Sequence, residues 1–411
     1  MRGIRPEPTT AHVPPILRRA TSLAAMTVLA GAGGSFFGFL YARARRSQGN
    51  DLTVYLRSAD ALARGGDPYT LDLPQGHGPY PLTIDTLVIP LTWIPVWLAQ
   101  AIWFGVNVAA LLGSLVVLDK LWRAAEPGQN AVLRLSLAVR LAAVTLALLV
   151  PLQSHLTRGQ VNLVVLWCCC LFLRAHLTGR EVAAAGWLGG AIALKLTPLV
   201  FLVGLARERK YRPLALTAVS VLVWAVGLPA LVASGRVVGI YAESWTASLE
   251  RETLGPVSFT PWSRFTLAAA LVRVWPRLAA LPGYRYLVTL AILAFLYWAQ
   301  GRVRGDARRR LLIFALGVVA IPLIAPKSEN HHLAMLAGPL WIWLLAAGSP
   351  PLRPTLDVPA AVLFLGLAWV GARQTASLFD FLALAVLFCI LAWRVLSPGR
   401  RSGVARVTVV E

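Results

Sequence analysis

The chain has 411 residues, of which 57% are hydrophobic and 14% are charged, with a mean hydropathy of +0.66 and a formal net charge of +21. Soluble proteins carry about 25% charged residues, so this composition excludes an ordinary soluble domain. Apolar runs long enough to cross a bilayer recur along the sequence. We therefore predict an all-α polytopic membrane protein, in which the basic charge reports topology and not nucleic-acid binding.

The apolar segments predict about 11–12 transmembrane helices in one membrane domain that extends over residues 1–411. Residues 1–20 and 397–411 are expected to be cytoplasmic tails. The expected spans are 21–41, 97–118, 135–152, 161–177, 183–205, 213–233, 284–300, 311–325, 333–348, 358–372 and 379–396.

The distribution of basic residues favours one orientation of these spans. With a cytoplasmic N-terminus, the segments on the cytoplasmic side hold 23 Lys/Arg and 8 Asp/Glu, whereas the longer outer loops hold 14 and 10. Cytoplasmic loops of membrane proteins carry such an excess of Lys and Arg. Both termini are therefore expected in the cytoplasm, and the protein is expected in a cell membrane.

The first outer loop, residues 50–82, has the pattern of an amphipathic helix that begins at Asp51. Gly65 and Gly66 are expected to end this helix. Its apolar stripe consists of Leu52, Tyr55, Leu56, Ala59 and Leu62. A carboxylate at a helix start is either a simple cap or an active group, and the pattern leaves both open.

Two further outer segments concentrate polar side chains. The turn SHLTRGQVN (154–162) contains Arg158, Gln160 and Asn162 at the mouth of a span, although polar turns of this length are common. The longest outer loop, 234–282, contains Arg264 among aromatic residues. Loops of this length are often functional lids or binding surfaces.

The apolar segment 183–205 contains a lysine at its centre, Lys195, and Pro198 three residues later. Basic residues flank both of its ends, so both ends are expected in the cytoplasm. Proline disfavours helix in the residue before it, and broken backbone at membrane depth must be buried in protein or line a cavity. We predict a re-entrant hairpin with Lys195 at its tip; the alternative is a lysine that snorkels from an ordinary span.

The last outer segment, IAPKSENHHLAM (324–335), places Lys327, His331 and His332 at a helix start. Adjacent histidines point about 100° apart on a helix and do not chelate one ion together. We expect neither a metal nor another cofactor.

These segments gather one candidate base and several cations on the outer face. Cations near the membrane surface suit the phosphate of a lipid-linked substrate. A single carboxylate could deprotonate an incoming hydroxyl, and cations would stabilise the phosphate as it leaves. The pattern predicts transfer of a group from a lipid phosphate to an acceptor outside the cytoplasm.

Five segments together resemble glycosyltransferase family 87, from about Asp51 to Met335. They read DLTVYLRSADALARGGDPY, GPYPLTIDTLVIPL, RGQVNLVVL, AGWLGGAIALKLTPLVFL and APKSENHHLAML. Two departures concern the acceptor and the sugar: Tyr80-Pro81-Leu82 stands where relatives often have a doubled proline, and Lys327 and Ser328-Glu329-Asn330 precede the histidines where a tryptophan is frequent.

The resemblance implies a GT-C fold in a bacterial plasma membrane, with the active site outside the cytoplasm. It also implies an inverting transfer from a polyprenyl-phosphate sugar, most often mannose, to a glycolipid or glycan. It implies that Asp51 is the general base. The expected donor-binding residues are Lys195, Arg158, His331, His332 and Lys327. The expected acceptor or pocket-lining residues are Tyr55, Tyr80, Gln160, Asn162 and Arg264.

A transporter or flippase for an anionic or lipid-linked substrate is the alternative. Transporters usually contain two related halves with paired broken helices, and the sequence has one KLTP-type break without a partner in its second half. Transport also gives no reason for a carboxylate at the start of the outer helix.

Overall fold

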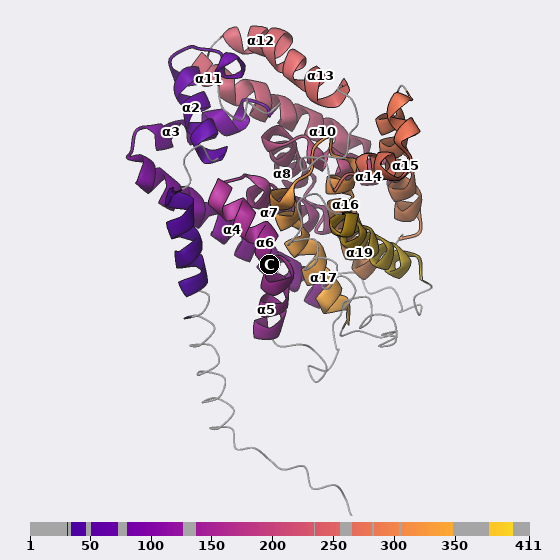
Figure 1. The fold of residues 1–411 in the computed structure, drawn as a ribbon. Helices are drawn as coiled ribbons and strands as arrows, with labels where there is room; N and C mark the ends of the chain where they lie inside the picture. The colour runs from indigo at the N-terminus through magenta and orange to yellow at the C-terminus, as the bar shows by residue number, and fades with distance from the viewer. Residues whose placement is uncertain are drawn as a thin grey trace, which may run out of the picture.

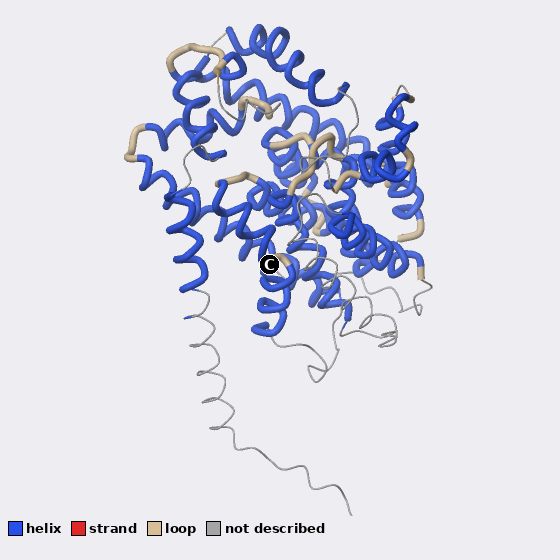
Figure 2. Tube along the Cα trace, in the orientation of Figure 1, coloured by secondary structure: helices blue, strands red, loops and turns tan. Residues whose placement is uncertain are grey.

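The computed structural model describes residues 31, 34–46, 51–72, 80–125, 137–233, 235–254, 265–281, 283–303, 306–347 and 378–397. These residues form helices joined by short loops and contain no strand (Figures 1 and 2). The prediction of an all-α protein is confirmed. The predicted span 358–372 and nearly all of both predicted tails lie outside the described residues.

The helices follow one another closely along the chain. In order they are α2 (Asp51–Ala63), α3 (Thr83–Thr92), α4 (Val96–Ala125), α5 (Leu137–Ala147), α6 (Leu149–Arg158), α7 (Asn162–Leu177), α8 (Glu181–Leu194), α9 (Leu202–Arg207), α10 (Tyr211–Leu222), α11 (Leu228–Ala233), α12 (Arg236–Ile240), α13 (Thr246–Leu254), α14 (Leu267–Val274), α15 (Tyr284–Gly301), α16 (Ala307–Ile324), α17 (Ala337–Ala347) and α19 (Leu378–Leu396). Short 3₁₀ turns include η1 (Pro68–Thr70), η3 (Thr197–Phe201) and η7 (Asn330–Leu336).

Among the described residues, two continuous helical segments are long and apolar enough to cross a bilayer alone, Val96–Ala125 and Tyr211–Ala233. The pair α5 and α6 adds a third if it counts as one span, and it bends by 74°. The sequence predicted a span over 135–152, and in the structure the chain bends within it. It bends because Pro151, in the first turn of α6, cannot donate the helical hydrogen bond that would continue α5.

Apolar side chains cover the outside of the helical body as well as its core. Leu222 on α10 and Leu287 and Leu290 on α15 are each at least 60% exposed. Soluble monomers rarely expose large contiguous apolar patches, whereas lipid-facing helices do so because hydrocarbon is their solvent. These surfaces agree with the polytopic membrane protein that the composition predicts.

An ion pair accounts for the one arginine in the middle of the predicted span 135–152. Arg140 is 5% exposed, and its Nη1 donates to Asp119 Oδ1 on α4 at 2.7 Å. Its guanidinium also lies over the Trp341 ring, 4.7 Å from the centroid. A buried charge is tolerated when it is paired and hydrogen-bonded in this way.

The segment 183–205 is a re-entrant hairpin, as predicted. Helix α8 ends at Leu194, where Lys195 has extended backbone angles, and the chain then forms η3 and α9. The chain then returns to the end of the molecule at which α8 begins. Arg212 Nη1, at the start of α10, lies 3.6 Å from Oε2 of Glu181, the first residue of α8. The break places Lys195 at the tip of the hairpin.

Helices far apart in sequence enclose this hairpin. Helix α8 packs against its sequence neighbours α7 and α10, whereas η3 packs against α16 and α9 packs against α15. Figure 1 shows α12 and α13 crossing the end of the molecule near α2 and α3, with α5 and α17 toward the opposite end. At the tip of the hairpin, Lys195 contacts Asn162, the first residue of α7, and both α6 and α7 pack against η7.

Candidate active site

Helix α2 is the amphipathic helix that the sequence predicts, and it begins at Asp51. Its apolar stripe packs on the protein: Leu52, Tyr55 and Leu62 are at most 2% exposed. The helix ends at Ala63, and Gly65 then takes a left-handed backbone with φ of 78°. Glycine adopts this conformation without steric strain, so the sequence fixes the length of the helix.

A glycine brings the start of α2 against the turn after α6. Gly159 caps α6 with φ of 71° and donates its backbone N–H to the His155 carbonyl at 3.0 Å. A Cβ on Gly159 would lie 2.8 Å from the Cβ of Leu52, and the Gly159 carbonyl accepts a 2.7 Å hydrogen bond from Trp103 Nε1. The absence of a side chain thus lets Asp51 approach Arg158 and Gln160.

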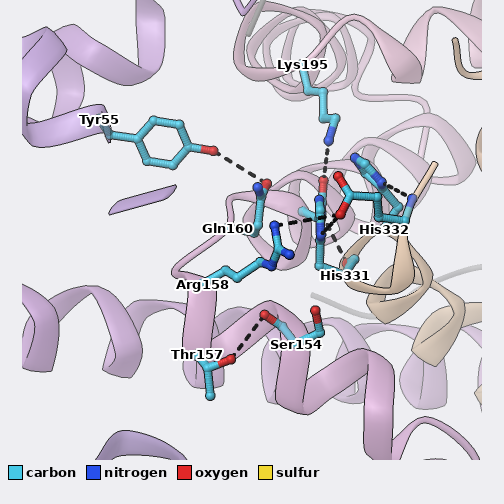
Figure 3. Close-up of polar contacts among 10 residues, drawn as sticks. Tyr55, Ser154, Thr157, Arg158, Gln160, Lys195, His331 and His332 are labelled. Carbon is cyan, nitrogen blue, oxygen red and sulfur yellow. Dashed lines mark hydrogen bonds and ion pairs between the residues drawn. The ribbon is translucent and has the colours of Figure 1, made fainter. Parts of the chain in front are cut away.

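Gln160 connects Asp51 to Tyr55. The Tyr55 hydroxyl donates a long hydrogen bond, 3.5 Å, to Gln160 Oε1 (Figure 3), and the Gln160 side chain is hydrogen-bonded to Asp51. The second carboxylate oxygen of Asp51, Oδ2, is buried and accepts no hydrogen bond from the described residues. One oxygen of Asp51 is therefore held in place while the other is available to take a proton.

Burial raises the pKa of the Asp51 carboxyl above its ordinary value. The hydrogen bond from Gln160 and the positive charges of Arg158 and Lys195 oppose this effect but do not cancel it. A carboxylate with a raised pKa is a stronger base than an exposed aspartate, which suits proton abstraction near neutral pH.

A buried chain of hydrogen bonds runs from Lys195 to η7. Lys195 Nζ donates to Asn162 Oδ1 at 2.8 Å, and Asn162 Nδ2 donates to the His331 carbonyl at 3.2 Å. Lys195 and Asn162 are 7% and 0% exposed. The Lys195 ammonium also lies 5.2 Å from the centroid of the Tyr80 ring. Asn162 thus fixes the ammonium without neutralising its charge.

A second set of contacts joins Arg158 to η7. Arg158 Nη1 lies 3.7 Å from Glu329 Oε2, and the same oxygen lies 3.9 Å from His331 Nδ1. The Glu329 backbone N–H donates to His332 Nδ1 at 2.9 Å. Figure 3 shows Arg158, Lys195, His331 and His332 converging from separate segments of the chain.

The structure therefore brings together most of the residues that the sequence singled out. The contacts described above join Asp51, Tyr55, Arg158, Gln160, Asn162, Lys195, Tyr80, His331 and His332. Lys327 is exposed, unlike the buried Lys195. Arg264 lies outside the described residues.

Two residues at the site were missed by the sequence analysis. Glu329 was noted only as a departure from the family pattern, yet its carboxylate contacts Arg158 and His331. His155 is 0% exposed, and its Nε2 lies 2.9 Å from Asn107 Oδ1. The position of His155 three residues before Arg158 on the same helix was a usable signal, whereas nothing local pointed to Glu329.

This arrangement brings the partly buried carboxylate of Asp51 close to two cations, Arg158 and Lys195. The carboxylate can accept a proton from a hydroxyl, and the cations can bind a phosphate. Within the described residues, no three His, Cys, Asp or Glu side chains are grouped closely enough to hold a metal ion.

Comparison of the sequence with known proteins identifies the family of this chain. The sequence model of glycosyltransferase family 87 matches residues 79–326. A polyprenol-phosphate-mannose-dependent alpha-(1-2)-phosphatidylinositol pentamannoside mannosyltransferase of Mycobacterium tuberculosis is 27% identical, over 89% of this chain and 82% of its own. A polyprenol-phosphate-mannose-dependent alpha-(1-2)-phosphatidylinositol mannoside mannosyltransferase of Mycolicibacterium smegmatis is 30% identical, over 79% of this chain and 70% of its own. Since the family model matches more than half of its length, this chain belongs to glycosyltransferase family 87.

Proposed function

We propose that this protein is an inverting mannosyltransferase, which moves mannose from a polyprenyl phosphate to a glycolipid outside the cytoplasm of a bacterial cell. The relatives are named for a polyprenol-phosphate-mannose donor and phosphatidylinositol mannoside acceptors. The observation that carries the proposal is that Arg158 and Lys195 lie close enough to Asp51 for their positive charges to act on its carboxylate. Family membership supports a transferase over the transporter that the sequence left as an alternative.

In the proposed reaction, Asp51 Oδ2 removes the proton from an acceptor hydroxyl as its oxygen attacks the anomeric carbon. The new bond forms between the acceptor oxygen and that carbon. The bond between the carbon and the phosphate oxygen breaks, and its electron pair leaves with polyprenyl phosphate. Attack from the face opposite the leaving group inverts the configuration of the anomeric carbon.

Lys195 and Arg158 bind the donor phosphate in this mechanism. The phosphate gains negative charge as the bond to the sugar breaks, so fixed cations stabilise the transition state more than the ground state. The hydrogen bond between Lys195 and Asn162 positions the ammonium before the donor arrives. We assign His331 and His332 to binding of the donor and Tyr55 and Tyr80 to binding of the acceptor.

The basic residues of the loops assigned to the cytoplasm support an outer location of the site, and cysteine labelling tests it. Arg57 is exposed on α2, and Lys210 is exposed beyond α9. A membrane-impermeant maleimide should label Arg57→Cys in spheroplasts and Lys210→Cys only after lysis, with wild type as background. Labelling in the reverse order would put the site on the cytoplasmic side.

The activity is tested with the purified full-length protein in nanodiscs. Polyprenyl-phosphate mannose with a labelled sugar is mixed with bacterial glycolipids, and polyprenyl-phosphate glucose serves as a second donor. We expect label to move from the mannose donor to a glycolipid. If the folded protein transfers only glucose, the sugar is wrong; if it transfers neither, the proposed function fails.

A further inference from the structure

Glu329 places a second carboxylate among the cations of the candidate site. Its side chain is 18% exposed, and Oε2 lies 3.7 Å from Arg158 Nη1. The Lys195 ammonium is under the electrostatic influence of both Asp51 and Glu329. The two fixed cations are thus balanced by two carboxylates, although a site that binds only a phosphate has no need of the second one.

The backbone of η7 fixes the position of this carboxylate. The Glu329 side chain accepts a hydrogen bond from the first turn of η7, while the His332 side chain accepts one from the Glu329 backbone N–H. Such reciprocal caps restrict both side chains. Glu329 is therefore held in reach of Arg158 in the absence of substrate.

The charge of the substrate phosphate changes during the proposed reaction. In the donor the phosphate is a diester with one negative charge, whereas the polyprenyl phosphate product is a monoester that carries about −1.5 to −2 near neutral pH. A pocket with cations alone would bind the product more tightly than the donor, and slow release of product would limit turnover.

We infer that Glu329 is a positioning residue that sets product release: its carboxylate competes with the product phosphate for Arg158. The inference rests on the proposed function. When polyprenyl phosphate forms, Arg158 and Lys195 stabilise it. The Glu329 carboxylate repels the added negative charge and takes Arg158 back as the phosphate departs. No bond is made or broken in this step.

The inference is tested first by binding and without any sugar. The full-length protein in nanodiscs is titrated with a short-chain prenyl monophosphate and with the matching uncharged prenyl alcohol. Glu329→Gln keeps the length and the capping oxygen of the side chain but removes its charge. We expect Glu329→Gln to bind the monophosphate at least about fivefold more tightly than wild type, with unchanged affinity for the alcohol.

Two further variants separate charge from structure. Glu329→Asp should keep the weaker wild-type affinity because it keeps the charge. Glu243→Gln removes an exposed outer carboxylate and should have no effect. If Glu329→Gln binds the monophosphate no more tightly than wild type while its thermal midpoint is preserved, the inference is wrong. If Glu329→Gln does not fold, Glu329→Asp decides the question. Tighter binding of the monophosphate by Glu329→Asp than by wild type would also overturn the inference.

Turnover distinguishes failure of this inference from failure of the proposed function. In wild type, transfer of mannose supports the proposed function, and its absence refutes that function whatever the binding result. Where wild type transfers, Glu329→Gln should complete a single turnover at nearly the wild-type rate but be inhibited by lower concentrations of product in multiple turnover. Equal product inhibition in the two proteins would contradict the role of Glu329 alone.

Discussion

Replacing Gly159 by alanine should move the start of α2 and with it the Asp51 carboxylate. The added Cβ would lie 2.8 Å from the Cβ of Leu52 and 3.4 Å from the Trp103 ring. The contact on Leu52 is at the root of a side chain, so no rotamer change relieves it. The backbone of α2 has to retreat by about 0.6 Å to restore an ordinary contact of 3.4 Å.

Two energies follow from this change. The left-handed backbone of residue 159 destabilises alanine by roughly 1–2 kcal/mol relative to glycine. The displacement of α2 acts on catalysis separately, because a misplacement of about 1 Å can reduce a rate by about 10²-fold. We expect Gly159→Ala to lower kcat/KM for transfer by about 10- to 100-fold, and to lower the thermal midpoint by only a few degrees.

Gly179→Ala is the matched control. Gly179 also has a left-handed backbone, with φ of 74°, but a Cβ there meets no atom within 4 Å. Both variants carry the same backbone strain, and only Gly159→Ala presses on α2. Measured side by side, they should lose similar stability, and Gly159→Ala should lose far more activity. Equal activity in the two variants would refute the packing argument.

Three other perturbations follow from the structure. Burial raises the pKa of the Asp51 carboxyl above its ordinary value of 3.8. Because a general base acts only when deprotonated, kcat/KM should fall as the pH is lowered, with a midpoint above 3.8. A pH profile that stays flat until the protein unfolds would contradict this role. Lys195→Met should lower kcat/KM for the donor by roughly 10- to 100-fold, because a charged hydrogen bond contributes about 1.5–3 kcal/mol. A donor titration that matches wild type would show that Lys195 does not bind the phosphate. Arg140→Leu leaves the partly buried Asp119 without its partner on α5 and should destabilise the fold by roughly 1–3 kcal/mol. Adding Asp119→Leu should recover much of the lost thermal midpoint, and no recovery would show that the pair is not the cause.

Local signals in the sequence predicted the two elements that build the site. The apolar stripe from Leu52 to Leu62 and the glycines after it defined α2 and its end. Pro198 and the basic residues on both sides of 183–205 defined the re-entrant hairpin and its tip. Each signal lies within a few residues of the feature that it predicts, because helix caps, breaks and faces depend on neighbouring residues.

The contacts between these elements could not be read from the sequence in the same way. The close fit of Gly159 against Leu52 depends on the packing of α2 against the turn after α6, which is more than 100 residues away in the chain. Glu329 acquires its role from the fold of η7 against Arg158, and the local pattern SEN shows only a polar helix start. The sequence analysis did not predict the bend between α5 and α6, because Pro151 lies within a continuous apolar segment that has the composition of a single span.

Asp51 as the general base is the central claim, and α2 supplies its own control. Asp60 lies on the same helix, 47% exposed, in an ion pair with Arg64 at 3.0 Å. Asp51→Asn and Asp60→Asn make the same chemical change at the two positions and should both leave the protein folded. We predict that transfer of labelled mannose falls by about 10²- to 10⁴-fold in Asp51→Asn and stays near wild type in Asp60→Asn. Transfer by a folded Asp51→Asn protein at the wild-type rate would contradict the account.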